Sequence, residues 1–325
     1  MLYPLKFHPI FKDKIWGGEK IRTILKKDFA PLPNCGESWE ISGYQNNESI
    51  VKNGHLEGQS LNEIVDIYKG SLLGHRVFKK FKTEFPLLIK FIDSNEDLSI
   101  QVHPDDELAM RRHNSFGKTE MWYIIHADEN AELISGFNQQ MDKETYLRNF
   151  NNGTLTTILN TEKVFKDDVF FIPAGRIHTL GKGLLLTEIQ QSSDLTYRIY
   201  DFDRKDQHGN KRELHLEDAL DAIDYNYYRD YKTQYTDRNN TPFEIVRSKY
   251  FTTNKILLST RLDRDIEALD SFVIYICLEG NGYFDHGTSR IQLTIGDVVL
   301  IPAALKRYTL VPDQDLKLLE TFITE

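Results

Sequence analysis

One short stretch occurs twice in the chain. Residues 168–180 read "DVFFIPAGRIHTL" and residues 297–309 read "DVVLIPAALKRYT", and the two align without a gap. In both copies an apolar run leads into an Ile-Pro-Ala sequence, which predicts a strand followed by a turn in which proline fixes φ. We therefore expect two domains that share this strand–turn unit. Only the first copy contains a histidine, His178, because Arg307 stands at the aligned position of the second.

Short β-rich runs dominate the rest of the chain. The clearest are bounded by Gly, Pro, Asp or Asn and cover residues 85–93, 98–102, 120–127 and 184–189. The C-terminal third repeats this style. Many short strands joined by turns favour a sandwich or a barrel over a doubly wound sheet. The predicted fold class is therefore mostly β.

Few segments have the periodicity of a helix. Ser60 and Glu63 form a capping box in front of one of them. Helices are also expected over residues 105–113, 142–150 and 215–225. A tyrosine-rich polar stretch follows the last of these and lies between the two repeats. We therefore predict two domains, residues 1–235 and 236–325.

Composition excludes several classes of protein. With 325 residues the chain can bury a large core without disulfides. Its two cysteines, Cys35 and Cys277, form no C-x-x-C pair, which excludes a zinc–thiolate site. The net charge of −9 argues against a nucleic-acid partner. An anionic ligand must therefore be held by a local cluster of Arg or Lys.

The chain also lacks the signals of a membrane or secreted protein. Its first residues contain lysines and prolines where a signal peptide needs an apolar run, and no stretch approaches the ~20 apolar residues of a membrane span. We expect a cytoplasmic protein with no membrane partner. The oligomeric state is left open between a monomer and a homodimer.

A candidate metal site emerges around His178. In a small β-barrel alternate side chains point inward, so a histidine at the start of a strand can reach the interior. Gln101 and His103 lie two apart on a predicted strand and face the same side, and Glu120 begins another strand. Two imidazoles, one carboxylate and one amide oxygen suit zinc or a similar divalent ion. An open position for water would make that ion catalytic.

Other interpretations of the same residues remain open. His178 could be a core histidine with satisfied hydrogen bonds. Gln101 and His103 could form a polar strand edge that faces solvent. Glu120 could pair with Lys118, two residues earlier in the chain.

Several motifs together resemble one known family. They are "WGG" (16–18), "GESWEISG" (36–43), "FPLLIKFIDSNEDLSIQVHPDDELA" (85–109), "GKTEMWYII" (117–125) and "FFIPAGRIHTLGKG" (170–183). In combination they resemble the type I mannose-6-phosphate isomerases, also called phosphomannose isomerases, and most closely their short bacterial form. The resemblance runs from about Leu5 to Asp224 and continues more weakly to the end.

The resemblance implies a fold and a metal site. The fold is a pair of cupin-type (jelly-roll) β-barrels, of which the first is active. The family's ligands fall on Gln101, His103, Glu120 and His178, which implies one Zn²⁺ per chain. Arg307 occupies the corresponding place in the second barrel. A metal is therefore not expected there, and that barrel is assigned a structural or site-shaping role.

The resemblance also implies a reaction, the interconversion of mannose 6-phosphate and fructose 6-phosphate. Its enediol(ate) chemistry needs a divalent ion, a group that shuttles a proton, and a cation for the dianionic phosphate. We assign Arg198, which follows "SSDLTY", and Glu188 as catalytic residues. Glu188 is the candidate proton shuttle, and its pKa would have to be raised by burial. Ser99, Lys118 and Arg204 are assigned to substrate binding.

These assignments also have alternatives. Glu188 could form a salt bridge with Arg198, and two aspartates in "DFDR" compete for Arg204. Leu195 stands where longer relatives usually have Asn, which puts the phosphate contacts in doubt. The competing functions are an isomerase of another hexose phosphate and a non-catalytic sugar-binding cupin. An iron cupin dioxygenase is disfavoured, because it needs a compact H-x-H motif with a nearby Glu.

Overall fold

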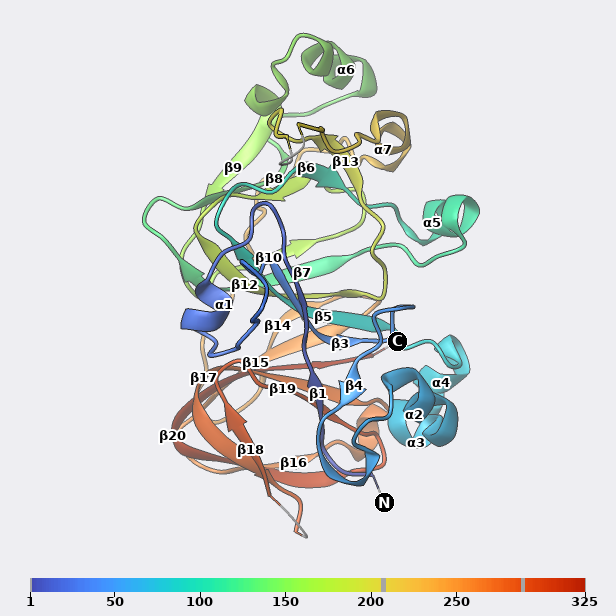
Figure 1. Cartoon of the computed structure of the whole chain (residues 1–325), viewed down its shortest axis with the longest axis vertical. Coiled ribbons are helices and arrows are strands. Elements are labelled where there is room, and N and C mark those ends of the chain that lie inside the picture. The colour runs from blue at the N-terminus through green and yellow to red at the C-terminus, as the bar shows by residue number, and fades with distance from the viewer. Residues whose placement is uncertain (1, 206–208, 288–289, 325) are drawn as a thin grey trace.

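The computed structural model describes residues 2–205, 209–287 and 290–324. Strands dominate it, and they form two β-barrels stacked along the long axis of the molecule, with the helices around the outside (Figure 1). The predicted fold class, mostly β with a few short helices, is confirmed.

The first barrel is built from two antiparallel sheets. Their buried side chains meet in one apolar cluster, in which Leu133 and Leu180 of one sheet pack with Trp122 and Ile124 of the other. One sheet has the order β10 (Val169–Ile172), β7 (Glu120–Ala127), β12 (Leu184–Gln191), β5 (Leu87–Ser94), β3 (Glu37–Ser42) and β2 (Ile10–Lys12). The other has the order β13 (Tyr197–Tyr200), β6 (Ile100–Val102), β11 (His178–Leu180), β8 (Glu132–Phe137) and β9 (Leu159–Lys163).

The second barrel is one continuous nine-stranded sheet. Its path is β14 (Phe243–Arg247), β15 (Thr252–Leu258), β20 (Arg307–Phe322), β17 (Val273–Asp285), β19 (Val298–Ile301), β1 (Leu5–His8) and β4 (Ile50–Val51), with β16 (Leu262–Asp265) on β20 and β18 (Arg290–Thr294) on β17. The long strands β17 and β20 shift register near Gly280, where a β-bulge bends the pair. Gly280 has φ +80°, and a Cβ there would lie 1.9 Å from the carbonyl oxygen of Asp315, so only glycine fits.

The two barrels share a core. Strand β1 pairs with β19, with Leu5 opposite Leu300, so the N-terminus lies in the sheet of the second barrel. Alternate residues of β5 face this shared core, among them Leu87, Ile89 and Phe91. The residues between them face the interior of the first barrel, as the two-residue period of a strand requires. The division at residue 235 therefore stays a prediction.

All four predicted helices are present. They are α2 (Leu61–Tyr68), α5 (Asp106–His113), α6 (Lys143–Asn151) and α7 (Leu216–Ala222). Both hydrogen bonds of the predicted Ser60–Glu63 capping box form. Further helical segments are α1 (Lys20–Thr23), α3 (Gly70–Leu73), α4 (His75–Phe81), and the 3₁₀ turns η1 (Gly54–Leu56), η2 (Leu155–Ile158) and η3 (Glu267–Leu269).

The duplicated stretch adopts the same local structure twice. Asp168 accepts a hydrogen bond from the backbone N–H of Phe165, and Asp297 accepts one from Thr294, each at 2.8 Å. The strands that follow are β10 and β19. After each strand the proline carbonyl accepts a hydrogen bond from the residue three further on. In the first barrel the chain then enters β11 at His178, as the sequence predicts.

Candidate active site

Three predicted site residues form a row across one sheet of the first barrel. His178 on β11 lies opposite Gln101 on β6, and Gln101 lies opposite Arg198 on β13. Residues that are opposite one another on neighbouring strands share a face of the sheet. His103 follows two residues after Gln101 and completes the group on this side.

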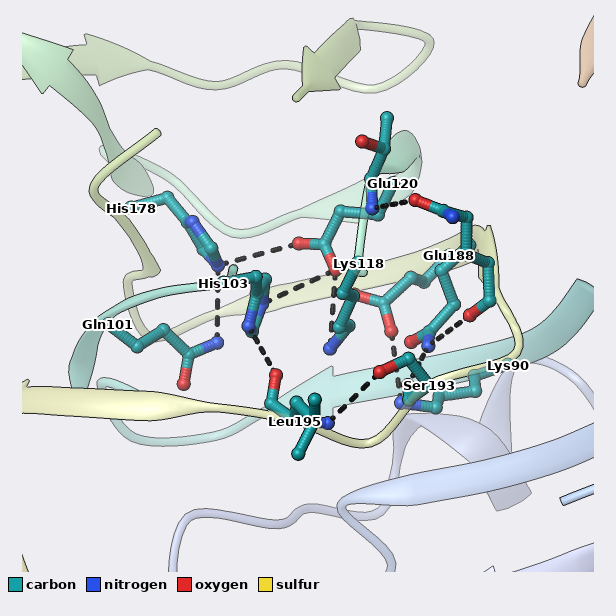
Figure 2. A network of polar contacts seen from close by, with 12 residues as sticks. Lys90, Gln101, His103, Lys118, Glu120, His178, Glu188, Ser193 and Leu195 are labelled. Atoms are coloured by element: carbon teal, nitrogen blue, oxygen red, sulfur yellow. Dashed lines mark hydrogen bonds and ion pairs between the residues drawn. The ribbon is translucent and has the colours of Figure 1, made fainter. Parts of the chain in front are cut away.

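The facing sheet carries a second row. Trp122 on β7 lies opposite Glu188 on β12, which lies opposite Lys90 on β5. Glu120 precedes Trp122 by two residues and therefore points to the same face. The two rows meet in the interior of the barrel, where Glu120 comes close to both histidines (Figure 2).

His103, Glu120 and His178 form a compact buried cluster. Glu120 Oε2 lies 3.6 Å from His103 Nε2, and Glu120 Oε1 lies 3.4 Å from His178 Nε2. One ligand atom from each residue falls within 4.8 Å of the others, and all three side chains are buried. This is the geometry of three protein ligands around one cation.

Backbone carbonyls fix both imidazole rings. His103 Nδ1 lies 2.8 Å from the carbonyl oxygen of Leu195, and His178 Nδ1 lies 2.8 Å from that of Arg176. A ring nitrogen next to a carbonyl carries the proton, so Nε2 of each ring keeps its lone pair for the cluster. Each histidine is therefore held in the tautomer that a metal ion requires.

The atoms that face the cluster centre are poorly satisfied by the protein. His103 Nε2 and both oxygens of Glu120 are buried and have no hydrogen-bond partner. Buried polar atoms normally have one, and a bound cation is an accepted reason for an exception. Lys118 lies 3.3 Å from Glu120 Oε2. The Glu120–Lys118 ion pair considered from sequence therefore coexists with the cluster.

Burial shifts the pKa values of the three groups. It lowers the pKa of His103 well below its ordinary value, with Lys118 acting in the same direction, and it lowers the pKa of His178 to about 4. Neutral imidazoles are the form that coordinates a metal. Burial raises the pKa of Glu120 to about 8, and the neighbouring Glu188 contributes. A divalent ion at the cluster centre would favour the ionised carboxylate instead.

Gln101 supplies the fourth candidate ligand. Its Nε2 lies 3.2 Å from His178 Nε2. Amide oxygen and nitrogen exchange places by a half-turn of the side chain and are assigned by their surroundings. The oxygen can therefore occupy the position next to His178. The donor set of two neutral imidazoles, one carboxylate and one amide oxygen fits zinc.

Glu188 belongs to a buried ion cluster that the sequence did not predict. Its Oε1 lies 3.2 Å from Lys90 Nζ, and its Oε2 accepts a hydrogen bond of 2.9 Å from the indole of Trp122. Lys90 Nζ also lies 3.9 Å from Glu37 Oε2. The alternative of a Glu188–Arg198 salt bridge is wrong, because the Glu188 carboxylate contacts Lys90 and Trp122, while Arg198 donates to the carbonyl of Glu213.

The expected direction of the Glu188 pKa shift is also wrong. Burial by itself would raise this pKa, but the Lys90 and Lys118 ammonium groups outweigh it and hold the pKa below its ordinary value. Glu188 is therefore ionised at neutral pH. Its Oε1 is buried and accepts no hydrogen bond, and its contact at 3.2 Å is the ion pair with Lys90, so a ligand would share this oxygen with the lysine.

A cavity of about 280 Å³ opens beside the cluster. Its lining includes Ser99, Lys118 and Arg198, which were predicted, and Lys90, Arg212 and Asp194, which were not. Arg204 is bound to Asp201 by a contact of 2.5 Å and donates to the carbonyl of Asp97. One of the two competing aspartates, Asp201, thus holds Arg204, and it holds Arg212 as well.

Of the charged residues that were not predicted, Lys90 could have been found from the sequence and Arg212 could not. Lys90 is a single lysine inside the apolar run "FPLLIKFID", where a buried charge needs a partner. The alternation of that strand places Lys90 on the inner face together with Leu88 and Ile92. Arg212 gave no such signal, because it reaches the cavity from a segment without regular structure.

Comparisons with known proteins agree with this geometry. The family model "Phosphomannose isomerase type I, catalytic domain" matches residues 4–134, and the model "Mannose-6-phosphate isomerase, cupin domain" matches residues 239–316. Mannose-6-phosphate isomerase ManA of Bacillus subtilis is 35% identical over 316 residues, which cover 94% of this chain and 95% of the relative. The mannose-6-phosphate isomerase of Streptococcus mutans is 34% identical with full coverage of both chains.

The chain belongs to the type I phosphomannose isomerase family. A crystal structure of the mannose 6-phosphate isomerase from Bacillus subtilis superimposes with a TM-score of 0.87 at 33% identity, over 98% of this chain and 99% of that one. A mutant of phosphomannose isomerase from Salmonella typhimurium shares the fold at 14% identity with a TM-score of 0.79. Its alignment covers 99% of this chain and 100% of that one.

The family assignment confirms the resemblance derived from the sequence motifs. The matched catalytic-domain region contains Gln101, His103 and Glu120, which lie in the first barrel. The cupin-domain match falls on the second barrel. Among the helices in the described part of the chain, none has the length and apolar character that a bilayer crossing requires.

Proposed function

We propose that this family member interconverts mannose 6-phosphate and fructose 6-phosphate, with one zinc ion held by Gln101, His103, Glu120 and His178. The observation that carries the proposal is the buried cluster of two neutral imidazoles and a carboxylate beside a cationic cavity. The full-length relatives in Bacillus subtilis and Streptococcus mutans, both named mannose-6-phosphate isomerase, support the choice of substrate.

The chain's own residues provide the metal ligands and orient them. The carbonyls of Leu195 and Arg176 keep the two rings directed at Glu120. When bound, zinc supplies Lewis acidity that polarises the substrate carbonyl and stabilises charge on an enediol(ate).

Glu188 is the proposed proton shuttle. It is ionised and buried, and its Oε1 makes an ion pair with Lys90 but accepts no hydrogen bond, so it can take the proton from C2 of the open-chain aldose. Returning that proton to C1, while the hydroxyl proton of O2 passes to O1, gives the ketose. The lowered pKa makes the carboxylate ready as a base at neutral pH. The positive charge of Lys90 stays within 3.2 Å to stabilise it after each turnover.

Arginines are proposed to hold the phosphate end. Arg198 lines the cavity, and its Nε is buried without a hydrogen-bond partner. A planar guanidinium is well suited to a phosphate dianion. Arg204 can join it by exchanging Asp201 for the phosphate. Ser99 and Lys118 line the same cavity and are proposed to contact the sugar.

A coupled assay tests the proposal. The protein is expected to convert mannose 6-phosphate to fructose 6-phosphate. This activity should be lost after treatment with a chelator and should return when zinc is added. Glucose 6-phosphate, assayed in parallel, is expected to react far more slowly. Turnover that survives complete metal removal would refute the metal-dependent mechanism. Faster turnover of glucose 6-phosphate would favour the alternative of another hexose-phosphate isomerase, and sugar binding without turnover would favour a non-catalytic cupin.

A further inference from the structure

The tyrosine-rich stretch between the two repeats packs on the turn that carries His178. The Arg176 side chain is only 8% exposed. Its guanidinium carbon lies 4.6 Å from the ring centroid of Tyr228 and 4.8 Å from that of Tyr231. A guanidinium enclosed by aromatic rings gains cation–π stabilisation, and the gain is larger when water is excluded. We call Tyr228 and Tyr231 the tyrosine clamp.

Arg176 connects the tyrosine clamp to the metal cluster. Its side chain lies with the two tyrosines, while its carbonyl accepts the hydrogen bond from His178 Nδ1. The preceding Gly175 has φ +89°, donates from its N–H to the carbonyl of His103 at 2.9 Å, and accepts from the N–H of Asp224 at 2.8 Å. The turn therefore joins both ligand histidines to Asp224, at the start of the segment between the two repeats, which we call the linker (residues 224–240).

The clamp itself is anchored. Tyr231 is 5% exposed, and its hydroxyl donates to the carbonyl of Phe137 at 2.7 Å. Gly136 makes room for this ring, since a Cβ there would lie 2.3 Å from it. The Tyr228 hydroxyl donates to Asp224 Oδ2 at 2.7 Å. One ring is thus fixed to β8 and the other to the linker residue that also contacts Gly175.

We propose that Tyr228 and Tyr231 are positioning residues for the metal centre. By holding Arg176 they fix its carbonyl, which keeps Nε2 of His178 directed at Glu120. The inference rests on the proposed zinc site. A clamp that served only for packing would stabilise the fold without changing zinc affinity, and this difference makes the inference testable.

Zinc affinity, measured by titrating the zinc-loaded protein with a chromophoric chelator, provides the test. Tyr228→Leu removes a ring face at a position that is 39% exposed, so the variant is expected to fold. Its zinc affinity should fall about tenfold, the lower end of what outer partners of metal ligands contribute. Tyr228→Phe keeps the ring but loses the hydrogen bond to Asp224, so its zinc affinity should fall less than that of Tyr228→Leu. Arg176→Met removes the cation and should resemble Tyr228→Leu.

Two controls separate positioning from packing. Tyr227→Leu alters a neighbouring ring that is 45% exposed, and its zinc affinity should equal that of wild type. Thermal unfolding of each variant reports on stability. Unchanged zinc affinity in Tyr228→Leu and Arg176→Met would overturn the inference, whatever happens to the unfolding temperature. Wild-type protein that binds no zinc would instead overturn the metal centre, and the clamp's role with it.

Discussion

Lys90→Met should destabilise the protein in a way that depends strongly on pH. Lys90 Nζ lies 3.2 Å from Glu188 Oε1, and both side chains are only 4% exposed. At this distance the attraction between unit charges is about 5 kcal/mol for an effective dielectric constant of about 20. Removing one partner of a buried pair costs about 3 to 5 kcal/mol, because the other charge stays buried without compensation. Methionine keeps the unbranched stem up to the ε position and removes only the charged end.

The sign of the pH dependence follows from Glu188. In the wild type its folded pKa lies below the ordinary value of 4.5, so the pair contributes stability above that pH and loses it as the pH falls through the folded pKa. Without Lys90, burial is expected to raise the folded pKa above 4.5. The variant then becomes less stable as the pH rises from 4.5 through the raised folded pKa of Glu188, because the buried carboxyl must ionise without its partner. The loss relative to wild type should be about 3 to 5 kcal/mol near neutral pH and about 1 kcal/mol or less near pH 4.

Urea unfolding at several pH values measures this difference, with a chelator present so that zinc adds no pH dependence of its own. Glu188 also faces Trp122 and Lys118, and Lys90 faces Glu37. A double-mutant cycle with Glu188→Gln therefore isolates the pair, and a coupling of about 2 to 3 kcal/mol is expected. Lys14→Met is the matched control, since Lys14 pairs with Glu37 but is 35% exposed. A loss of stability that is the same at every pH would refute the reasoning.

Three further outcomes are expected. His178→Ala should lose zinc and isomerase activity together by metal analysis and coupled assay, whereas Arg307→Ala, at the aligned and 74% exposed position, should lose neither. Arg198→Ala should retain zinc but lose turnover by about a hundredfold or more, and loss of zinc would mean that its role is misassigned. Glu320→Gln should lower the free energy of unfolding by about 3 kcal/mol, because Glu320 is fully buried against Arg264. The kcat of Glu320→Gln should equal that of wild type. A changed kcat would mean that the second barrel contributes to the reaction.

The sequence predicted those site residues that depend on strand alternation or on motifs. Gln101 and His103 face one side because they are two apart on a strand, and the repeated turn delivers His178 to the next strand. What it could not predict depends on which strands become neighbours. Lys90 meets Glu188 only because β5 pairs with β12, almost 100 residues further along the chain.

Long-range contacts also explain the missed fold details. Helix α4 begins without a capping side chain of its own, because Asp270 accepts hydrogen bonds from the N–H groups of His75 and Arg76. No local pattern can reveal a cap supplied from nearly 200 residues away. Likewise β1 enters the second barrel through Leu5 and Leu300, a pairing that local periodicity does not specify.

The registers of the two barrels show how the surroundings of His178 and of the aligned Arg307 differ. In the first, Ile172 lies opposite Glu120, and in the second the aligned Ile301 lies opposite Val273. The second barrel therefore has an apolar residue in place of the ligand carboxylate. The aligned Arg307 points outward and pairs with Asp265, which occupies the register position of Gln101.

One buried carboxylate nevertheless recurs at equivalent positions. Glu188 lies opposite Trp122 and Lys90, and Glu320 lies opposite Tyr275 and Asn254. Glu320 accepts hydrogen bonds from both of these neighbours and from Arg264, so its oxygens are satisfied. In residues 243–287 and 290–324, the described C-terminal part of the second barrel, no buried side-chain nitrogen or oxygen lacks a hydrogen-bond partner, whereas His103, Glu120 and Glu188 all have such atoms. An unsatisfied buried polar atom costs stability. The unsatisfied atoms of His103, Glu120 and Glu188 therefore indicate that the first barrel is less stable at its candidate site than it could be, as is expected of a functional site.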